Sequence, residues 1–194
     1  MSRPSGVLLT GGASRRLGHD KAGLVLGGET LASRAARVLS LVCDGVVEVG
    51  PGSARVAFTQ EDPPGAGPLA ALVAGADALR KPASLLLFAV DLPCVEAPLL
   101  RLIAEHVGDG VVVPISGGVR QWTCARYDRP AIAAARRLVD RGERSLRALA
   151  QEGDVAVVEI AESEWAAVAP NDAFFDIDTE ADARRLGIDL PTKP

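Results

Sequence analysis

Residues 7–21 read VLLTGGASRRLGHDK, a short apolar run followed at once by a loop rich in glycine and basic residues. The run VLLT predicts a β-strand, and in open α/β sheets ligands bind beyond the carboxyl ends of the strands. Gly11 and Gly12 would let backbone N–H groups approach an anion closely. The side chains available to that anion are those of Ser14, Arg15, Arg16 and Lys21. The stretch therefore predicts a phosphate-binding loop, with a surface loop of merely solvated arginines as the alternative.

The spacing of this loop excludes two common glycine loops. A Walker A loop has four residues between its glycines and continues with Lys-Ser or Lys-Thr. Here five residues separate Gly12 from Gly18, and His-Asp-Lys follows. A dinucleotide fingerprint needs G-x-G-x-x-G at the start of a helix. In this chain the first glycines are adjacent, and AGLVLGGET (22–30) is typical of a brief extended turn.

The composition favours a single domain over residues 1–194. Of the 194 residues 48% are hydrophobic, which is enough to bury one sizeable core. A formal net charge of -4 argues against broad nucleic-acid binding, for which a basic surface is the usual sign. Only three of the 21 basic residues are lysines, so Lys21 is either kept in the loop for its compact charge or there by chance.

Cysteine usage and hydropathy indicate the compartment. The three cysteines are far apart and form no C-x-x-C pair, which argues against a disulfide framework or a structural zinc site. The N-terminal segment lacks the apolar length of a signal peptide, and no apolar run approaches the roughly 20 residues that cross a bilayer. We expect a cytoplasmic protein without membrane contacts.

Strand and helix patterns alternate along the chain. The expected strands cover 7–10, 46–49, 55–58, 84–90, 111–114, 119–127 and 155–160. The expected helices cover 29–42, 69–79, 98–106, two segments of 130–150 and the C-terminal TEADARRLG (179–187). SLLLFAV (84–90) is apolar on both faces, as in a central parallel strand, and 119–127 is a candidate antiparallel partner. This alternation predicts a three-layer α/β fold with a mostly parallel central sheet.

Asp91 follows the apolar run LLLFAV directly and precedes Leu-Pro. Its carboxylate should lie at the same sheet edge as the basic loop. A carboxylate there suits Mg²⁺, which proteins usually hold with one or two carboxylates plus substrate phosphates. The alternative is that Asp91 caps the helix that begins after Pro93.

Two further acidic segments are ambiguous. In QEDPPGAGPLAAL (60–72), Asp62 could accept hydrogen bonds from the edge of a guanine ring, or the Gly-Pro step could simply start a helix. In FFDIDTEAD (174–182), Asp176 and Asp178 alternate with apolar residues and should share one side of a strand. They are either a solvated face or a second metal position.

The first block and its continuation, LLTGGASRRLGHDKAGLVLGGETLASRAARVL (8–39), resemble the N-terminal signature of the molybdenum cofactor guanylyltransferases, usually L-A-G-G-x-S-x-R-M-G-x-D-K. Further blocks match in the same order: GPLAAL (67–72), VDLP (90–93), SGGVRQWTCARY (116–127), GERSL (142–146) and DIDTEAD (176–182). The resemblance covers nearly the whole chain. It implies the Rossmann-like nucleotidyltransferase fold, with the nucleotide in the N-terminal part and the acceptor in the C-terminal part.

The resemblance implies transfer of GMP from GTP to the terminal phosphate of molybdopterin, with Mg²⁺ and release of pyrophosphate. The residues at the family's nucleotide-binding positions are Leu9, Thr10, Gly11, Gly12, Lys21, Asp62 and Asp91. Leu9, Thr10 and Gly11 would contact the nucleotide through backbone groups. Lys21 would bind its phosphates, and Asp62 would bind guanine. Asp91 would bind the metal, with Asp178 as a second metal position. The catalytic set would be Lys21, Arg16 and Asp91, acting in an in-line attack of an acceptor phosphate oxygen on the α-phosphorus.

The chain departs from the family pattern at several positions. Thr10 replaces the usual alanine, and Gly50 stands where many members carry an asparagine that helps to hold the nucleotide. Asp176 and Asp178 replace asparagines, and Glu180 replaces proline. The change at Thr10 is small, Gly50 bears on base affinity and selectivity, and the acidic replacements bear on metal and acceptor binding.

Rival functions follow from these departures. One is a relative that uses CTP, or a sugar or another small phosphate acceptor; another is a non-catalytic nucleotide-binding or cofactor-carrier protein. On the acceptor side, family position and charge suggest Arg120, Arg126 and Arg144. The resemblance also implies transient contacts with other molybdenum cofactor biosynthesis proteins or with target enzymes.

Overall fold

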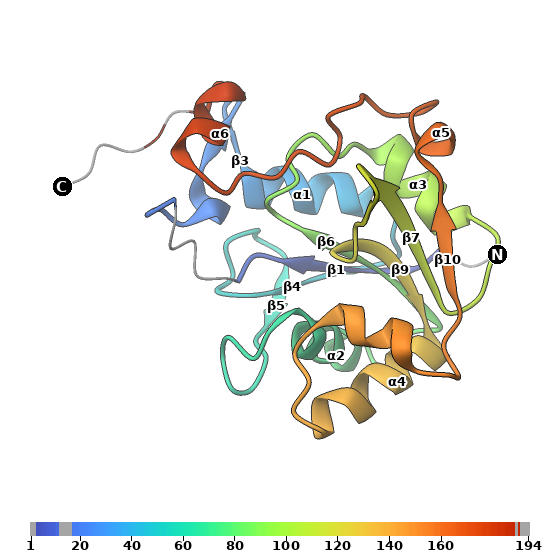
Figure 1. Cartoon of the computed structure of the whole chain (residues 1–194). Helices are drawn as coiled ribbons and strands as arrows, with labels where there is room; N and C mark the ends of the chain where they lie inside the picture. Colours follow the sequence, from blue (N-terminus) through green and yellow to red (C-terminus); the bar gives the residue numbers. More distant parts are fainter. Residues whose placement is uncertain (1–2, 12–16, 189, 191–194) are drawn as a thin grey trace.

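The computed structural model describes residues 3–11, 17–188 and 190, and within them eight strands form one sheet (Figure 1). Their order is β10-β7-β9-β6-β1-β4-β5, with β8 paired to β7. The strands are β1 (Ser5–Leu9), β4 (Val46–Val49), β5 (Ala57–Thr59), β6 (Ser84–Ala89), β7 (Val111–Ser116), β8 (Val119–Arg120), β9 (Cys124–Asp128) and β10 (Val157–Ile160).

The sheet is mostly parallel, which confirms the expected fold class. β1 pairs in parallel with β4 and with β6, β4 pairs in parallel with β5, and β10 does so with β7. The antiparallel strands are β9, which pairs with both β6 and β7, and the short β8, which pairs with β7. The strand expected over 119–127 is divided into β8 and β9, and each is antiparallel to β7.

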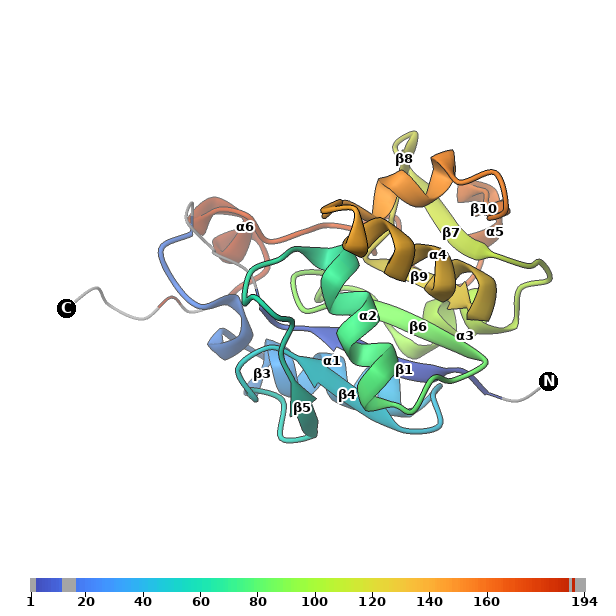
Figure 2. The ribbon, with the colours of Figure 1, turned by 90° about the horizontal axis from the view of Figure 1, so that it is seen from below.

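Helices cover both faces of the sheet, so the three expected layers are present (Figures 1 and 2). One face carries α1 (Leu31–Ser40) and α3 (Ala97–Glu105), with the short α5 (Glu162–Trp165) beside β7. The other carries α2 (Pro68–Ala78), α4 (Arg129–Asp140) and the 3-10 helix η2 (Leu146–Gln151). The last helix is α6 (Glu180–Arg185). In the described ranges no helix combines the length and apolarity needed to span a membrane.

Local sequence signals start these helices. Thr30 caps α1 by accepting a hydrogen bond from Ser33 N, and Asp128 caps α4 by accepting one from Ala131 N. α2 begins at Pro68, whose missing N–H costs nothing in a first turn. At the C-terminus Thr179 accepts from Asp182 N, as the expected helix requires.

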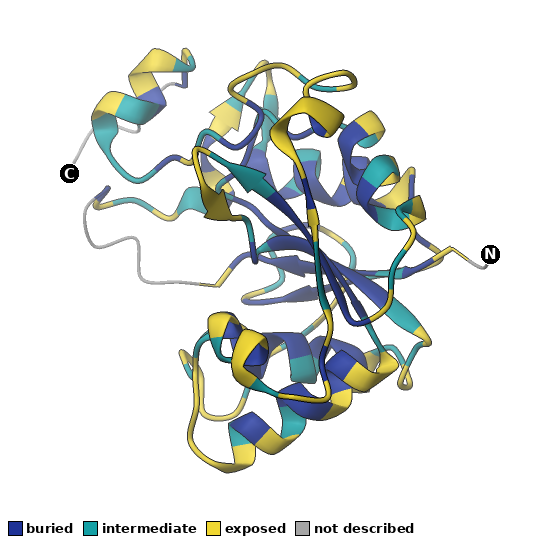
Figure 3. Ribbon diagram, turned by 45° about the vertical axis from the view of Figure 1, so that its right-hand side comes forward, coloured by how far each residue is buried: buried dark blue, intermediate teal, exposed yellow. Residues whose placement is uncertain are grey.

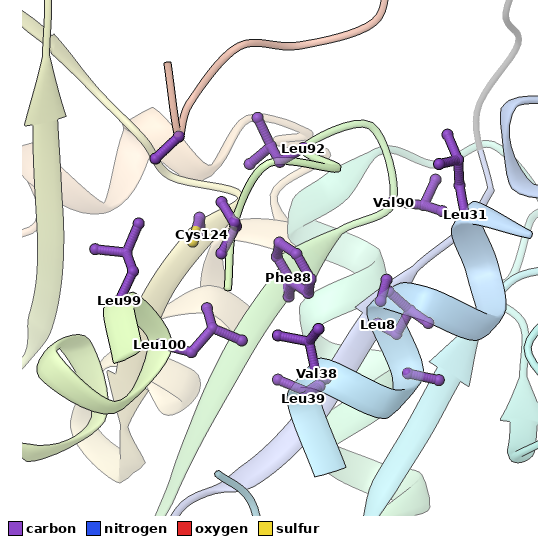
Figure 4. Packing of buried hydrophobic residues seen from close by; sticks show 14 of the residues in the cluster. Leu8, Leu31, Val38, Leu39, Phe88, Val90, Leu92, Leu99, Leu100 and Cys124 are labelled. Carbon is purple, nitrogen blue, oxygen red and sulfur yellow. The ribbon is translucent and has the colours of Figure 1, made fainter. Parts of the chain in front are cut away.

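The core lies on both sides of β1 and β6 (Figure 3). Towards α1 and α3, Leu8 and Phe88 of neighbouring strands pack with Val38, Leu39 and Leu100 (Figure 4). Side chains alternate along a strand, so the residues between them face α2 and α4 instead. Burial on both sides explains why SLLLFA carries no polar alternation.

Several local expectations are wrong. β5 begins at Ala57 rather than Arg55, whose φ of 56° lies outside the strand region. The second helix of 130–150 is the 3-10 helix η2. Residues after Lys21 form a one-turn 3-10 helix η1 (Lys21–Gly23) and a two-stranded hairpin of β2 (Val25–Leu26) and β3 (Glu29–Thr30), which the sequence indicated only as an extended turn.

Gly75 sets how closely α2 lies on β1. A Cβ at this position would stand 2.7 Å from both Cγ atoms of Val7, a fully buried β-branched residue. Although alanine is the better helix former, Gly75→Ala should destabilise the protein by about 1–3 kcal/mol because the core would be overpacked. Urea denaturation measures the loss, and Val7→Ala in the same chain should recover part of it.

Gly153→Ala is the matched control for this experiment. A Cβ there meets nothing within 4 Å. That variant should be neutral or slightly stabilised because it restricts only the unfolded chain. An equal loss of stability in both variants would contradict the packing argument.

Candidate active site

The carboxyl ends of β1, β4 and β6 meet at one edge of the sheet, and a cavity of about 730 Å³ opens there. Its walls include Leu9, Thr10 and Gly11 after β1, Gly50 after β4 and Asp91 after β6. These are the strand ends at which the sequence predicted a ligand. Gly12 and Arg16 lie outside the described residues, as do Ser14 and Arg15.

Lys21 connects distant parts of this edge. Its Nζ lies 2.8 Å from Asp178 Oδ1 and 3.3 Å from Asp91 Oδ2. The side chain is held at the start of η1, where the Asp20 carboxylate accepts a hydrogen bond from Ala22 N. Asp91 and Lys21 therefore lie at the same edge of the sheet, as expected, while their roles in binding and catalysis stay predictions.

The charges at this edge shift two pKa values. Burial by itself lowers the pKa of Lys21, but the hydrogen bond that Lys21 donates to Asp178 and the charges of both carboxylates outweigh it and raise the pKa. Burial raises the pKa of Asp91, against the charge and hydrogen bond of Lys21, and the nearby negative charge of Asp176 adds to the rise. Opposite charge therefore keeps Lys21 protonated, while burial makes the ionised form of Asp91 less favourable than in water.

Asp176 and Asp178 do not lie on a strand, so the expectation of a shared strand face is wrong. Their segment is irregular, and Ile177 N donates to the backbone oxygen of Asp91 rather than to a neighbouring strand. The turn is fixed by Asp182, whose carboxylate accepts from Asp178 N and from Thr179. Consequently Asp178 contacts Lys21, while Asp176 lines a second cavity.

Asp91 does not cap the following helix. The N-cap of α3 is Glu96, five residues farther on, and it makes no side-chain cap hydrogen bond. The Asp91 carboxylate is engaged with Lys21 instead. The alternative of a purely local capping role is thus excluded.

The loop of residues 60–67 forms another wall of the large cavity. Gln60, Glu61 and Gly65 line it, whereas the neighbouring Asp62 is exposed and is not among the lining residues. Glu61 Oε1 accepts a hydrogen bond from Gly65 N across the turn. The role of Asp62 towards guanine stays a prediction, and Glu61 is the acidic side chain that this loop places at the cavity.

Arg144 also shapes this wall. Its guanidinium donates to the backbone oxygens of Gly65 and Ala66, both at 3.0 Å. The side chain expected on the acceptor side therefore holds the loop of the first cavity.

The second cavity, of about 520 Å³, adjoins the first. Pro68, Asp91 and Thr123 line both. Its own charged residues are Arg120, Arg147 and Asp176. Arg120 pairs with Glu159 and lies over the Trp122 ring at 5.9 Å from the centroid. Asp91 therefore stands where the two cavities meet.

Arg126 is not a candidate for acceptor binding. It is 9% exposed, and its guanidinium donates to the backbone oxygens of Ala104, His106 and Gly108. It stabilises the segment after α3, because those oxygens have no further helical partners. Charge and family position alone could not distinguish this structural arginine from Arg120.

Sequence reasoning missed Glu48. It lies within β4 and is fully buried, yet its carboxylate accepts hydrogen bonds at the rim of the large cavity. The signal was present, since an acidic residue inside the apolar run VVEV has to find partners if that run is a buried strand.

The residues at the cavity junction suit a divalent cation. Two carboxylates, Asp91 and Asp178, converge on one ammonium group, so the position already accommodates a positive charge. Within the described ranges no group of three or more His, Cys, Asp or Glu residues is arranged to hold a metal. Two carboxylates match a cation such as Mg²⁺, whose remaining ligands are usually water and substrate phosphates.

Residues 6–157 match the MobA-like NTP transferase domain. This chain belongs to the MobA-like NTP transferase family. Its activity is therefore that of a nucleotidyltransferase. The assignment agrees with the resemblance noted in the sequence, and the matched region runs from β1 to the start of β10.

Individual relatives agree with the family. The chain is 36% identical over 174 residues to a probable molybdenum cofactor guanylyltransferase of Opitutus terrae, covering 82% of this chain and 86% of that one. The fold resembles that of molybdopterin-guanine dinucleotide biosynthesis protein A from Archaeoglobus fulgidus, with a TM-score of 0.79, 24% identity and coverage of 94% and 96%. It also resembles a Mycobacterium tuberculosis protein solved in complex with manganese, with a TM-score of 0.65, 20% identity and coverage of 95% and 97%.

The pKa of Lys21 is directly measurable because the chain has only three lysines. In protein labelled at lysine Cε, the NMR signal that disappears in Lys21→Arg should titrate above about 10.4, the ordinary lysine value. Asp178→Asn should lower that pKa, since burial then acts against one carboxylate instead of two. A wild-type pKa at or below the ordinary value would contradict the arrangement.

Proposed function

We propose that this chain transfers GMP from GTP to the terminal phosphate of molybdopterin and releases pyrophosphate. The observation that carries the proposal is the junction of the two cavities at Asp91, next to Lys21. A nucleotidyl transfer needs two phosphate-bearing substrates side by side with positive charge between them. The guanylyltransferase names of the relatives support GTP and molybdopterin as those substrates.

The nucleotide is assigned to the larger cavity. Leu9, Thr10 and Gly11 line it behind the family signature, and Lys21 reaches it from η1. The Lys21 ammonium, now shared by two carboxylates, can turn to the phosphates of an arriving nucleotide and offset the charge on departing pyrophosphate. Gly12 and Arg16 complete the proposed loop by sequence position. On the opposite wall, Glu61 and the neighbouring Asp62 are the acidic candidates for guanine.

The acceptor is assigned to the smaller cavity. Arg120 and Arg147 supply positive charge for its phosphate, and Trp122 and Phe174 supply an apolar surface for a ring. The acceptor phosphate oxygen would attack the α-phosphorus, forming one P–O bond as the bond to pyrophosphate breaks. Nucleotide in the N-terminal part and acceptor in the C-terminal part would thus meet within one domain of 194 residues.

The metal is assigned to Asp91, with Asp178 as the second carboxylate. A bound Mg²⁺ would polarise the phosphates and neutralise part of their charge. Family membership and the manganese complex of a structural neighbour support a divalent cation in general. The choice of Mg²⁺ is part of the proposal.

Substrate selection tests the function. The protein is incubated with Mg²⁺, molybdopterin and one of the four nucleoside triphosphates, and pyrophosphate release is measured. We expect release with GTP and little with the others. A mixture without molybdopterin is the control, and one with a sugar phosphate tests the rival acceptor. Preference for CTP, or release only with the sugar phosphate, would overturn the guanylyl assignment.

Asp91→Asn separates catalysis from nucleotide binding. We expect turnover to fall about a hundredfold or more, equivalent to about 2.7 kcal/mol, while GTP affinity measured by calorimetry changes far less. The exposed Asp140→Asn at the end of α4 is the matched control and should keep full activity. Unchanged turnover in Asp91→Asn would remove this carboxylate from the reaction.

A further inference from the structure

Glu48 has a fully buried carboxylate, and its partners are Thr10, which lines the larger cavity, and three backbone amides of the turn that directly follows the lining residues Gly50 and Pro51. Oε1 accepts hydrogen bonds from Thr10 Oγ1 at 2.5 Å, from Gly52 N at 2.9 Å and from Ser53 N at 2.8 Å. Oε2 accepts one from Ala54 N at 2.7 Å. A buried carboxylate is tolerated only when such donors replace water. Glu48 therefore depends on the chain segments that follow both β1 and β4.

The same carboxylate ties two walls of the cavity together. Thr10 belongs to the wall after β1, and the turn of residues 52–54 follows Gly50 in the wall after β4. The backbone adds a second connection, since Thr10 N and Gly11 N both donate to Val49 O. Among the described residues, the hydrogen bonds to Glu48 come from Thr10 and the turn of residues 52–54, whereas Lys21 donates to Asp91 and Asp178. The Glu48 network thus acts on the nucleotide walls and not on the reacting centre.

The Thr10 hydroxyl and a side chain at position 50 would need the same space. A Cβ on residue 50 would stand 2.0 Å from Thr10 Oγ1 and 3.0 Å from Gly11 N. The hydroxyl cannot turn aside without losing its hydrogen bond to Glu48. The φ of Gly50, 156°, also favours glycine. The hydroxyl of Thr10 therefore occupies the space that a side chain at position 50 would need.

We propose that Glu48 is a positioning residue for the nucleotide, acting through the Thr10 hydroxyl, and that this hydroxyl adds to the φ of Gly50 in excluding a side chain at position 50. The two departures from the family signature, threonine at 10 and glycine at 50, are then one structural unit. The buried Glu48 carboxylate holds the segment after β1 and the turn after β4 at a fixed distance from one another. The inference rests on the proposed function only in placing the nucleotide in this cavity.

Substitution at Thr10 tests the positioning role. Thr10→Val keeps the volume but removes the donor, and should raise the Kd for GTP about tenfold, with kcat falling less than about threefold. Thr10→Ser retains the hydroxyl and should recover most of the lost affinity. Equal losses in kcat and affinity, or failure of the serine variant to recover affinity, would overturn the role. Circular dichroism and urea denaturation verify that each variant is folded.

A double-mutant cycle tests the link to position 50 without any enzymatic readout. Gly50→Ala should lower the melting temperature strongly in the wild-type chain and much less in a Thr10→Ala chain, because the atom it meets at 2.0 Å is then absent. Gly153→Ala, in open space, should have the same small effect in both chains. Equal losses from Gly50→Ala in both chains would refute the link. Since melting needs no substrate, this outcome is independent of whether GTP is the nucleotide.

Discussion

Parallel pairing of β1 with β4 and β6 brings three strand ends to one edge of the sheet, and the proposed chemistry depends on that convergence. The register places Leu9 opposite Val49 on one side and Ala89 on the other, so Thr10, Gly50 and Asp91 emerge close together. A slip of one residue would turn every side chain of a strand to the other face and bury the wrong set. The packing of Leu8, Phe88 and the helices therefore also fixes the active-site edge.

At this edge of the sheet, the positive charge of one lysine is placed between two acidic side chains, in a chain that is acidic overall. Lys21 is held by two carboxylates, and Asp91 stands at the junction of two cavities that take their residues from different parts of the chain. The antiparallel β9 contributes to this division, because it leads from the turn at Thr123, which lines both cavities, back beside β6. In the proposed function, this one carboxylate would face the nucleotide in one cavity and the acceptor in the other.

Much of this arrangement is readable from local patterns. The apolar runs predicted most strands of the sheet, and the position of Asp91 after the central run predicted that it lies at the same sheet edge as the loop that contains Lys21. The failures have a common cause. Asp176 and Asp178 alternate like a strand, but the edge they approach offers the backbone oxygen of Asp91 instead of a strand to pair with. The acidic residue inside VVEV indicated that Glu48 needs partners, but which groups supply them, the Thr10 hydroxyl and three backbone amides, depends on how distant segments pack.

The amino-acid sequence by itself determined the types of most elements, the family signature and the polar residues at strand ends, because periodicity, capping and turn formation act over a few neighbouring residues. Only the tertiary structure decided which polar residues meet. Lys21 donates to Asp178, which is 157 positions farther along the chain. The hydrogen bonds of the Arg126 guanidinium go to backbone oxygens at and after the end of α3, and the Thr10 hydroxyl fills the space beside Gly50. Such contacts depend on the order of strands in the sheet and on how deeply each side chain is buried. Both are decided by segments far apart in the sequence.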